Sequence, residues 1–307
     1  MRMDNQRESS NFEDRGRGGG GGGGGIGGLA LFGLLRMLGP RGMIVALLAL
    51  GAIFIFNPLG LRDAVLGGGT SSLSSSGGAG GSTCDASPTN QQACHFARQV
   101  LASTEDVWAQ QFSQGRLPRY GVQVGGYVNP TLVAFSDRVS TGCGEAPSSV
   151  GPFYCPADSK LYLDPTFYEV MAQRLNAPGD FAQAYVIAHE VGHHIQNLIG
   201  SSSGGLSGET ENQTSVRREL QADCFAGVWG HTAQTQLAID DSDLREALNA
   251  AHQIGDDTLQ SNAQGQINPA QFTHGTSAQR MRWFRRGFDT GDARQCDTFA
   301  VSNYGQL

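Results

Sequence analysis

The fold is decided by one stretch of sequence, DFAQAYVIAHEVGHHIQNLI at residues 180–199. Asp180 with Gln183 forms a box-like helix start, and Pro178-Gly179 interrupts the chain just before it. Gly200 suits the C-terminal end of the same helix. Apolar residues recur along one helix face, at Phe181, Ala184, Tyr185, Ala188, Val191 and Ile195. The stretch therefore predicts a buried helix over residues 180–199.

This apolar helix contains the motif His189-Glu190-Val191-Gly192-His193. Residues four apart lie on one helix face, so both imidazoles can reach one zinc ion (Zn²⁺). Glu190 lies beside the first histidine, where its carboxylate can take a proton from a water on that metal. Gly192 costs roughly 1 kcal/mol relative to alanine inside a helix, and a close backbone approach at the site would explain it. The alternative is two surface histidines with a chance glutamate, which the apolar setting disfavours.

A catalytic zinc site needs a third protein ligand and one open position. One known arrangement continues as HExxHxxGxxH, but this chain has Gln196 and Ile199 at those places. Another takes a glutamate from a following helix, with an aspartate four residues later. Glu219 and Asp223 match it, and Glu219 follows His193 by 26 residues. We expect Glu219 to bind the metal and Asp223 to orient a ligand histidine. The alternative third ligands are His231, Glu211 and Asp223 itself.

Hydrolysis of a peptide bond also needs a donor for the developing oxyanion. The candidates in this chain are His231, His252, His274, Tyr168 and Tyr185. We favour His274, because Thr276 with Gln279 predicts a capped helix directly after it. The alternative is an ordinary histidine in a surface loop.

The N-terminal part of the chain has a different composition. We expect residues 1–41 to be a disordered Gly-rich tail, because glycine is almost continuous from Gly18 to Gly25. Residues 42–61 carry no charge and have the length of a transmembrane helix. Arginines precede them, which predicts a single-pass anchor in the bacterial cytoplasmic (inner) membrane, with the N-terminus cytoplasmic and the catalytic domain outside. A cleaved signal peptide is the alternative. A Gly/Ser linker is expected at residues 62–83, before a folded domain at 84–307.

Charge and cysteine content narrow the function classes. The formal net charge is −7, which argues against a nucleic-acid partner, although Arg280 to Arg286 supplies four arginines for a local basic surface. The six cysteines all follow the apolar segment and form no CxxC pair. This pattern predicts disulfides in an oxidising compartment, with buried free thiols as the alternative. We expect Cys143–Cys155 and Cys84–Cys94 first, because each closes a short loop.

The remaining patterns predict a small strand region followed by helices, which is an α+β fold that is mainly helical. Strands are expected at 131–136, 152–155 and 160–164. Helices are expected at 91–112, 165–175, 180–199, 210–236, 242–259 and 276–288.

At these residues the chain resembles the bacterial neutral zinc metallopeptidase family, which are single-pass proteins with an external HExxH domain. The similarity covers nearly the whole chain, including residues 7–15, 154–158, 184–194, 255–257, 273–276 and 282–284. The resemblance implies a zincin-like metallopeptidase domain with His189, Glu190 and His193 at its centre. It also favours His189 as the partner of Asp223. By analogy with such folds, residues 160–164 would form the strand edge that binds an extended substrate.

The sequence therefore predicts a zinc metallopeptidase that acts on a peptide or protein substrate, with Glu190 as general base. A non-catalytic zinc-containing membrane adaptor is one alternative, and a cell-wall peptide amidase is another. A fourth protein ligand would favour the adaptor, and an open coordination position would favour an enzyme.

Overall fold

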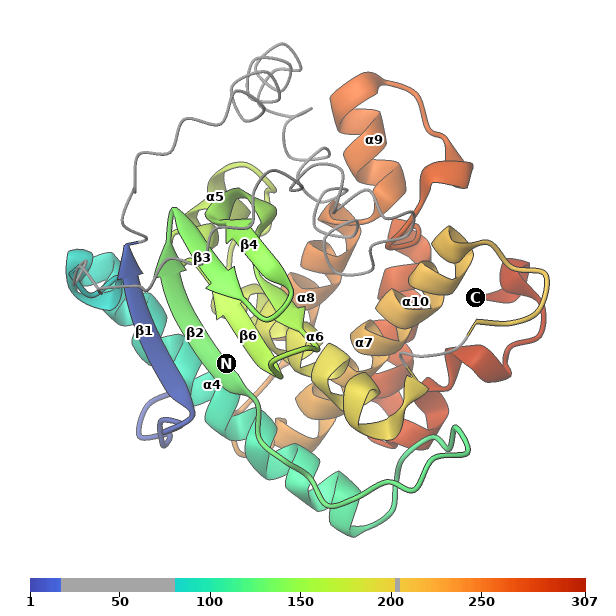
Figure 1. The fold of residues 1–307 in the computed structure, drawn as a ribbon, viewed down its shortest axis with the longest axis horizontal. Coiled ribbons are helices and arrows are strands. Elements are labelled where there is room, and N and C mark those ends of the chain that lie inside the picture. The colour runs from blue at the N-terminus through green and yellow to red at the C-terminus, as the bar shows by residue number, and fades with distance from the viewer. Residues whose placement is uncertain (18–80, 202–204) are drawn as a thin grey trace, which may run out of the picture.

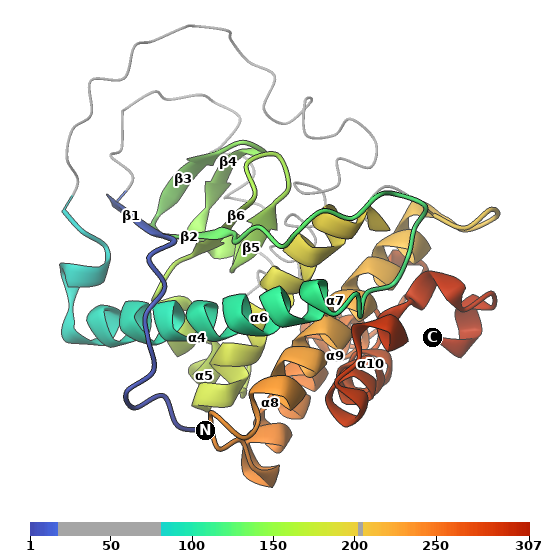
Figure 2. The ribbon, with the colours of Figure 1, turned by 90° about the horizontal axis from the view of Figure 1, so that it is seen from below.

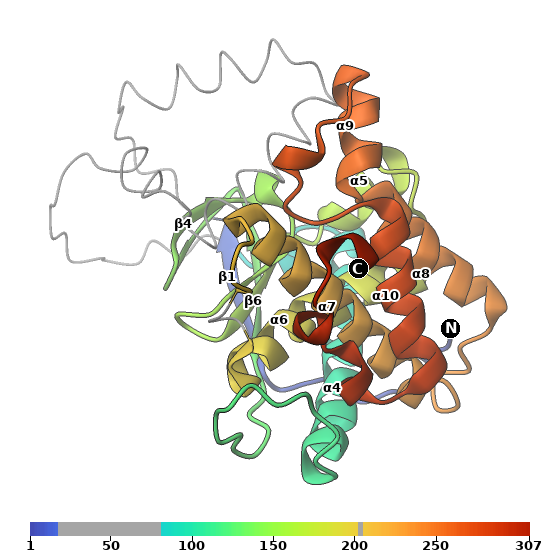
Figure 3. The same ribbon diagram turned by 90° about the vertical axis from the view of Figure 1, so that its right-hand side faces the viewer.

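A computed structural model describes residues 1–17, 81–201 and 205–307 of the chain. They form a small sheet packed against a group of helices (Figure 1). The long helices α4 and α6 lie next to the sheet, and α7, α8 and α10 pack together on the other side of α6 (Figure 2 and Figure 3). The prediction of a mainly helical domain with a small sheet is confirmed.

The main sheet has four strands in the order β1-β2-β6-β5. Strands β1 and β6 both run parallel to β2, and β5 pairs antiparallel with β6. Their bounds are Phe12–Arg17 for β1, Thr131–Ser136 for β2, Phe153–Cys155 for β5 and Lys160–Leu163 for β6. A separate antiparallel hairpin is made by β3 at Arg138–Thr141 and β4 at Gly144–Pro147. The strands at β2, β5 and β6 were predicted, whereas β1 and the hairpin were not.

Both faces of strand β2 are buried. Leu132 belongs to the main core with the helices, whereas Val133 and Phe135 pack in a second cluster with the hairpin. Alternate residues of a strand point to opposite faces, so a continuous apolar run such as TLVAF suits a strand that is covered on both sides.

Local sequence signals explain most of the helix bounds. Ser87 caps α4, and Thr210 and Thr276 form capping boxes for α7 and α10. The helices are α4 at Pro88–Ser113, α5 at Phe167–Gln173, α6 at Asp180–Ile199, α7 at Glu211–Ala233, α8 at Asp241–Gln253, α9 at Asp256–Gln264 and α10 at Ser277–Thr290. The single helix predicted at 242–259 is wrong, because the chain breaks at Ile254 and Gly255 into α8 and α9. A Cβ on Gly255 would lie 2.4 Å from the backbone nitrogen of Ser277, so this position is held against the start of α10.

Three disulfides connect the domain, and they include both expected pairs, Cys84–Cys94 and Cys143–Cys155. The third joins Cys224 on α7 to Cys296 near the C-terminal end. The described residues contain no free cysteine. The alternative of buried free thiols is therefore wrong.

The prediction of a disordered tail is wrong for residues 1–17. Residues Phe12–Arg17 form strand β1 at the outer edge of the sheet, next to β2 (Figure 1). Backbone pairing of Phe12 with Leu132 and of Glu13 with Val133 fixes the parallel register. The sequence FEDRGR has little apolar alternation, so its strand character depends on a partner that lies far away in the sequence.

The transmembrane helix that was predicted to precede the domain is not supported. No helix among residues 1–17, 81–201 and 205–307 has the length and apolar character needed to cross a membrane. The segment 42–61 itself lies outside the described residues, as does most of the predicted linker at 62–83.

Helices α7 and α10 pack closely because each helix has a glycine that faces the backbone of the other helix. A Cβ on Gly287 would lie 1.9 Å from the carbonyl oxygen of Cys224, and a Cβ on Gly227 would lie 2.1 Å from that of Phe284. We therefore expect Gly287→Ala to force the helices apart and lower the free energy of unfolding by about 1–3 kcal/mol. Gly126→Ala is the control, since a Cβ there meets nothing within 4 Å. Urea unfolding of both variants tests this, and equal stability of the two would contradict it.

Candidate metal centre

The site forms where α6 crosses α7. At the crossing, a Cβ on Gly192 would lie 2.9 Å from the carbonyl oxygen of Ala222 and 3.0 Å from its Cα. Glycine at this position therefore permits the close backbone approach that the sequence predicted. Because the two helices meet here, one turn of α6 carrying His189 and His193 lies opposite the turn of α7 that carries Glu219.

The structure brings together the three side chains predicted to bind the metal. His189 Nε2 lies 3.2 Å from Glu219 Oε2, and His193 Nε2 lies 3.5 Å from Glu219 Oε1. Ligand atoms about 2.1 Å from a tetrahedral zinc ion are about 3.4 Å from one another. The nitrogen–oxygen separations in this structure match that value, so the donor set fits zinc. The group contains these three donors, and no fourth His, Cys, Asp or Glu of the described chain joins it.

Each histidine is oriented through its other ring nitrogen. His189 Nδ1 lies 2.8 Å from Asp223 Oδ1, and His193 Nδ1 lies 2.9 Å from Gln196 Oε1. If Nδ1 donates in both rings, Nε2 carries the lone pair that a metal needs. Asp223 thus pairs with His189, the histidine favoured by the resemblance.

The cation that holds Asp223 was not predicted from the sequence. Arg280 on α10 is only 2% exposed. Its Nε donates to Asp223 Oδ2 at 2.9 Å, and a terminal nitrogen donates to Oδ1 at 2.9 Å. The Tyr185 hydroxyl also donates to Oδ1, at 2.5 Å. The sequence suggested a basic surface at Arg280 to Arg286, but Arg280 instead neutralises a buried carboxylate behind the site.

These contacts set the protonation of the donors. Burial favours the neutral form of both imidazoles, and it lowers the pKa of His193 to about 4. At His189 burial is outweighed by the charge of Asp223 and the hydrogen bonds to Asp223 and Glu219, which raise the pKa to about 10. Burial would raise the pKa of Glu219, but the charge of His193 and the hydrogen bond from His189 hold it well below its usual range. A carboxylate that stays ionised beside two imidazoles is suited to a divalent cation.

Glu190 lies beside this group and next to the sheet. The backbone N–H of Tyr154, on strand β5, donates a hydrogen bond to its carboxylate. Burial raises the pKa of Glu190 to about 7, and the negative charge of Glu219 acts in the same direction. A carboxyl group with this pKa can exchange a proton near neutral pH.

The strand nearest Glu190 is not the one expected to bind substrate. Strand β6, at Lys160–Leu163, lies between β2 and β5, so both of its edges are already paired. Residues 160–164 therefore do not form a free edge, and that prediction is wrong. Strand β5 is the edge strand on this side of the described sheet.

The positive charge of His274 helps to lower the pKa of Glu219. His274 therefore lies within electrostatic range of the metal donors. Asp256, which the sequence analysis did not identify as functional, fixes both the ring and the loop around it. One carboxylate oxygen lies 3.2 Å from His274 Nδ1, and the other accepts the backbone N–H groups of Thr273, His274 and Gly275 at 2.7–3.0 Å. Burial would lower the pKa of His274, but the charge of Asp256 and its hydrogen bond raise it.

The other candidates lie in different surroundings. Nδ1 of His231 is 2.7 Å from the carbonyl oxygen of Phe288, and His252 is exposed. The Tyr185 hydroxyl is bound to Asp223, and Tyr168 packs in the core against Phe96. Neither His231 nor Glu211 belongs to the group of three donors. His194, the residue after the motif, is 1% exposed and contacts the Tyr154 hydroxyl and the Val128 carbonyl.

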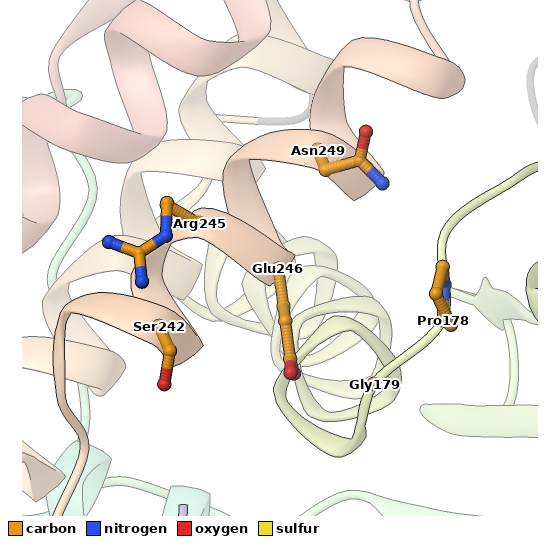
Figure 4. A pocket seen from close by; sticks show the side chains of 6 residues that line it. All are labelled: Pro178, Gly179, Ser242, Arg245, Glu246 and Asn249. Carbon is orange, nitrogen blue, oxygen red and sulfur yellow. The ribbon is translucent and has the colours of Figure 1, made fainter.

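A surface pocket lies at the beginning of α6 and not at the metal donors. It is lined by Pro178, Gly179, Ser242, Arg245, Glu246 and Asn249, and Figure 4 shows Glu246 extending from α8 toward Gly179. Glu246 accepts the backbone N–H of Phe181 at 3.0 Å, so it caps the first turn of α6. His189 lies nine residues after Asp180, the first residue of α6, or about 13 Å away at the rise of an α-helix.

The chain is similar to a known protein family and to uncharacterized bacterial proteins. Residues 1–299 match the family model described as "Putative neutral zinc metallopeptidase". The chain is 50% identical over 228 residues to the uncharacterized protein YpfJ of Escherichia coli, an alignment that covers 72% of this chain and 76% of YpfJ. It is 44% identical over 192 residues to the uncharacterized protein Mb2605 of Mycobacterium bovis, covering 59% and 66% of the two chains. No solved structure matches.

The hydrogen bond that His189 donates to Asp223 should contribute to metal affinity. We expect Asp223→Asn to weaken zinc binding about 10- to 100-fold, because the amide can neither orient His189 as an anion does nor pair with Arg280. Asp289→Asn, a change at an exposed carboxylate, is the control. Competition with a fluorescent chelator measures the affinity, and an unchanged affinity in Asp223→Asn would contradict the role of this hydrogen bond.

Proposed function

Because the chain belongs to the neutral zinc metallopeptidase family, we propose that it hydrolyses peptide bonds with zinc held by His189, His193 and Glu219. The observation that carries this proposal is the convergence of two oriented imidazoles and one ionised carboxylate, with Glu190 next to them. Three protein donors are typical of catalytic zinc sites, whereas structural sites use four. The number of donors therefore favours an enzyme over a zinc-containing adaptor.

A zinc ion bound here would lower the pKa of a water molecule and polarise the peptide carbonyl. The carboxylate of Glu190 takes the proton from the attacking water and then gives it to the leaving amine. The N–H of Tyr154 fixes the position of this carboxylate beside the metal donors. Burial keeps the proton affinity of Glu190 high enough for both transfers.

His274 is proposed to stabilise the oxyanion. Its raised pKa favours the protonated ring, which is a charged hydrogen-bond donor. Asp256 holds the ring and three backbone N–H groups of its loop, so the donor is fixed before substrate binds. Such prior orientation is what makes an oxyanion donor effective.

The substrate is proposed to be an extended peptide that lies along strand β5. This edge strand contains Tyr154, whose backbone already contacts Glu190, so a peptide beside it would place its carbonyl near the metal donors. Three disulfides favour an oxidising compartment, and we propose that the protein acts outside the cytoplasm. Peptides of the cell wall and of proteins share this backbone chemistry, so digests of both substrate classes distinguish an amidase from a protease.

Glu190→Gln tests the proposed reaction. We expect it to retain zinc, since Glu190 is not a ligand, and to lose about 100- to 10,000-fold in kcat/KM. Glu211→Gln is the matched control, because Glu211 is exposed and does not belong to the donor group. Metal analysis and a peptide-library digest, with and without a chelator, give the two readouts. Zinc binding without hydrolysis in the unmodified protein would instead favour the adaptor.

The activity should show a bell-shaped dependence on pH. Glu190 must be ionised, so kcat/KM falls as the pH drops through its pKa, which is about 7 without zinc and lower beside the cation. His274 must be protonated, so kcat/KM falls again as the pH rises through its raised pKa. We expect His274→Gln to lower kcat and remove the alkaline limb while zinc stays bound. An alkaline limb that survives this change would assign it to another group.

A further inference from the structure

Among the described residues, the hydrogen-bond and ion-pair partners of one buried carboxylate on α4 all come from the N-terminal segment. Glu105 is 4% exposed. The side chains of Ser9 and Asn11 donate to its Oε1 at 2.5 and 2.7 Å, and Arg7 pairs with Oε2 at 2.9 Å. Burying a carboxylate without partners is costly, so α4 requires these N-terminal side chains.

Backbone contacts hold the same segment in one register. The N–H of Leu132 donates to the carbonyl of Asn11 at 2.9 Å, and the N–H of Ser9 donates to that of Arg98 at 3.0 Å. Glu13 on β1 pairs with Lys160 on β6 at 2.5 Å. The segment is therefore recognised by hydrogen bonds along its main chain and by ion pairs, which include Arg7 with Glu105 and Glu13 with Lys160.

Asp14 forms hydrogen bonds with residues on both sides of the gap between the described residues 17 and 81. Its carboxylate accepts hydrogen bonds from the backbone N–H groups of Gly16, Thr83 and Cys84 and from the hydroxyl of Ser82, at 2.6–3.0 Å. The disulfide Cys84–Cys94 then fixes this point to α4. Residues 17 and 81 thus belong to one folded body.

We propose that α4, β2 and Lys160 form a peptide-binding surface whose occupant is the segment 7–17 of the same chain. The segment binds in the compartment that contains the metal centre, so residues 17 and 81 lie on the same side of any membrane. This inference replaces the expectation that the N-terminus and the catalytic domain lie on opposite sides. It does not depend on the proposed catalytic reaction.

Chemical cross-linking tests the contact, because Lys160 is the only lysine in the sequence. A water-soluble carbodiimide should join its Nζ to the Glu13 carboxylate as an amide, with loss of one water, and peptide mass spectrometry identifies the product. The reaction is run on the full-length protein. Absence of this amide in the unmodified protein would overturn the proposal.

Two substitutions at neighbouring serines give a matched pair. Ser9 is buried against Glu105, whereas Ser10 is exposed. We expect Ser9→Asp to reduce the cross-link at least tenfold by placing a second anion beside Glu105, and Ser10→Asp to leave it unchanged. The charge-swapped double variant Glu13→Lys with Lys160→Glu should restore the amide that either single change abolishes, which global unfolding could not do. Equal cross-linking in both serine variants would contradict the role of Glu105.

Isotope mixing identifies the chain that supplies the segment. Light and ¹⁵N-labelled proteins are mixed, unfolded, refolded and cross-linked. Products that carry only one isotope support binding within one chain. A substantial yield of mixed products would assign the segment to a second copy and overturn the proposal of an intramolecular occupant.

Cysteine labelling tests the compartment. Ser10→Cys and Ser302→Cys each introduce one exposed thiol, and the native cysteines are paired in disulfides. Intact spheroplasts of the expressing bacterium are treated with a membrane-impermeant maleimide before or after lysis. We expect the ratio of labelling before and after lysis to be the same for both variants. If one thiol reacted before lysis and the other reacted only after lysis, the inference would be wrong.

Discussion

The structure depends on how closely α6 and α7 approach one another. The backbone of Gly192 contacts Ala222, and a side chain at Gly192 would collide with the α7 backbone. Two histidines on one helix can face the same point, but only this crossing places Glu219 within 3.2–3.5 Å of both. The glycine is therefore unfavourable for the isolated helix and necessary for the pair. A local cost in helix propensity is accepted because the tertiary contact requires it.

The same crossing buries a second carboxylate that needs a counter-charge, because Asp223 lies one turn beyond Glu219 and is completely buried. Its charge is matched by Arg280 from α10, while Tyr185 and His189 use the remaining hydrogen-bonding positions. Helix α10 thus contributes to the metal centre without supplying a ligand. The contacts of Gly227 and Gly287 hold α10 against α7 at the distance that this ion pair needs.

Local signals in the sequence predicted the elements that they specify by themselves. Helix α6 has the predicted bounds, and capping residues set the starts of α7 and α10 within one residue. The features that were missed depend on distant partners. Strand β1 pairs with β2, and the break before α9 follows from contact with Ser277. Arg280 resembles its exposed neighbours in sequence, and only its position against Asp223 distinguishes it. Asp256 was missed for the same reason, because its loop contacts come from residues more than fifteen positions away.

The pairing of β1 with β2 has a consequence for the kinetics of folding. Phe12 pairs with Leu132, which is 120 residues later in the chain, and Glu13 must reach Lys160. Contacts of such high sequence separation form slowly, because a long loop must close before any of them contributes stability. During synthesis the first strand therefore has no partner until β2, at Thr131–Ser136 of the 307 residues, has been made. Over that period the unpaired strand is a point at which newly made chains are exposed to misfolding and proteolysis.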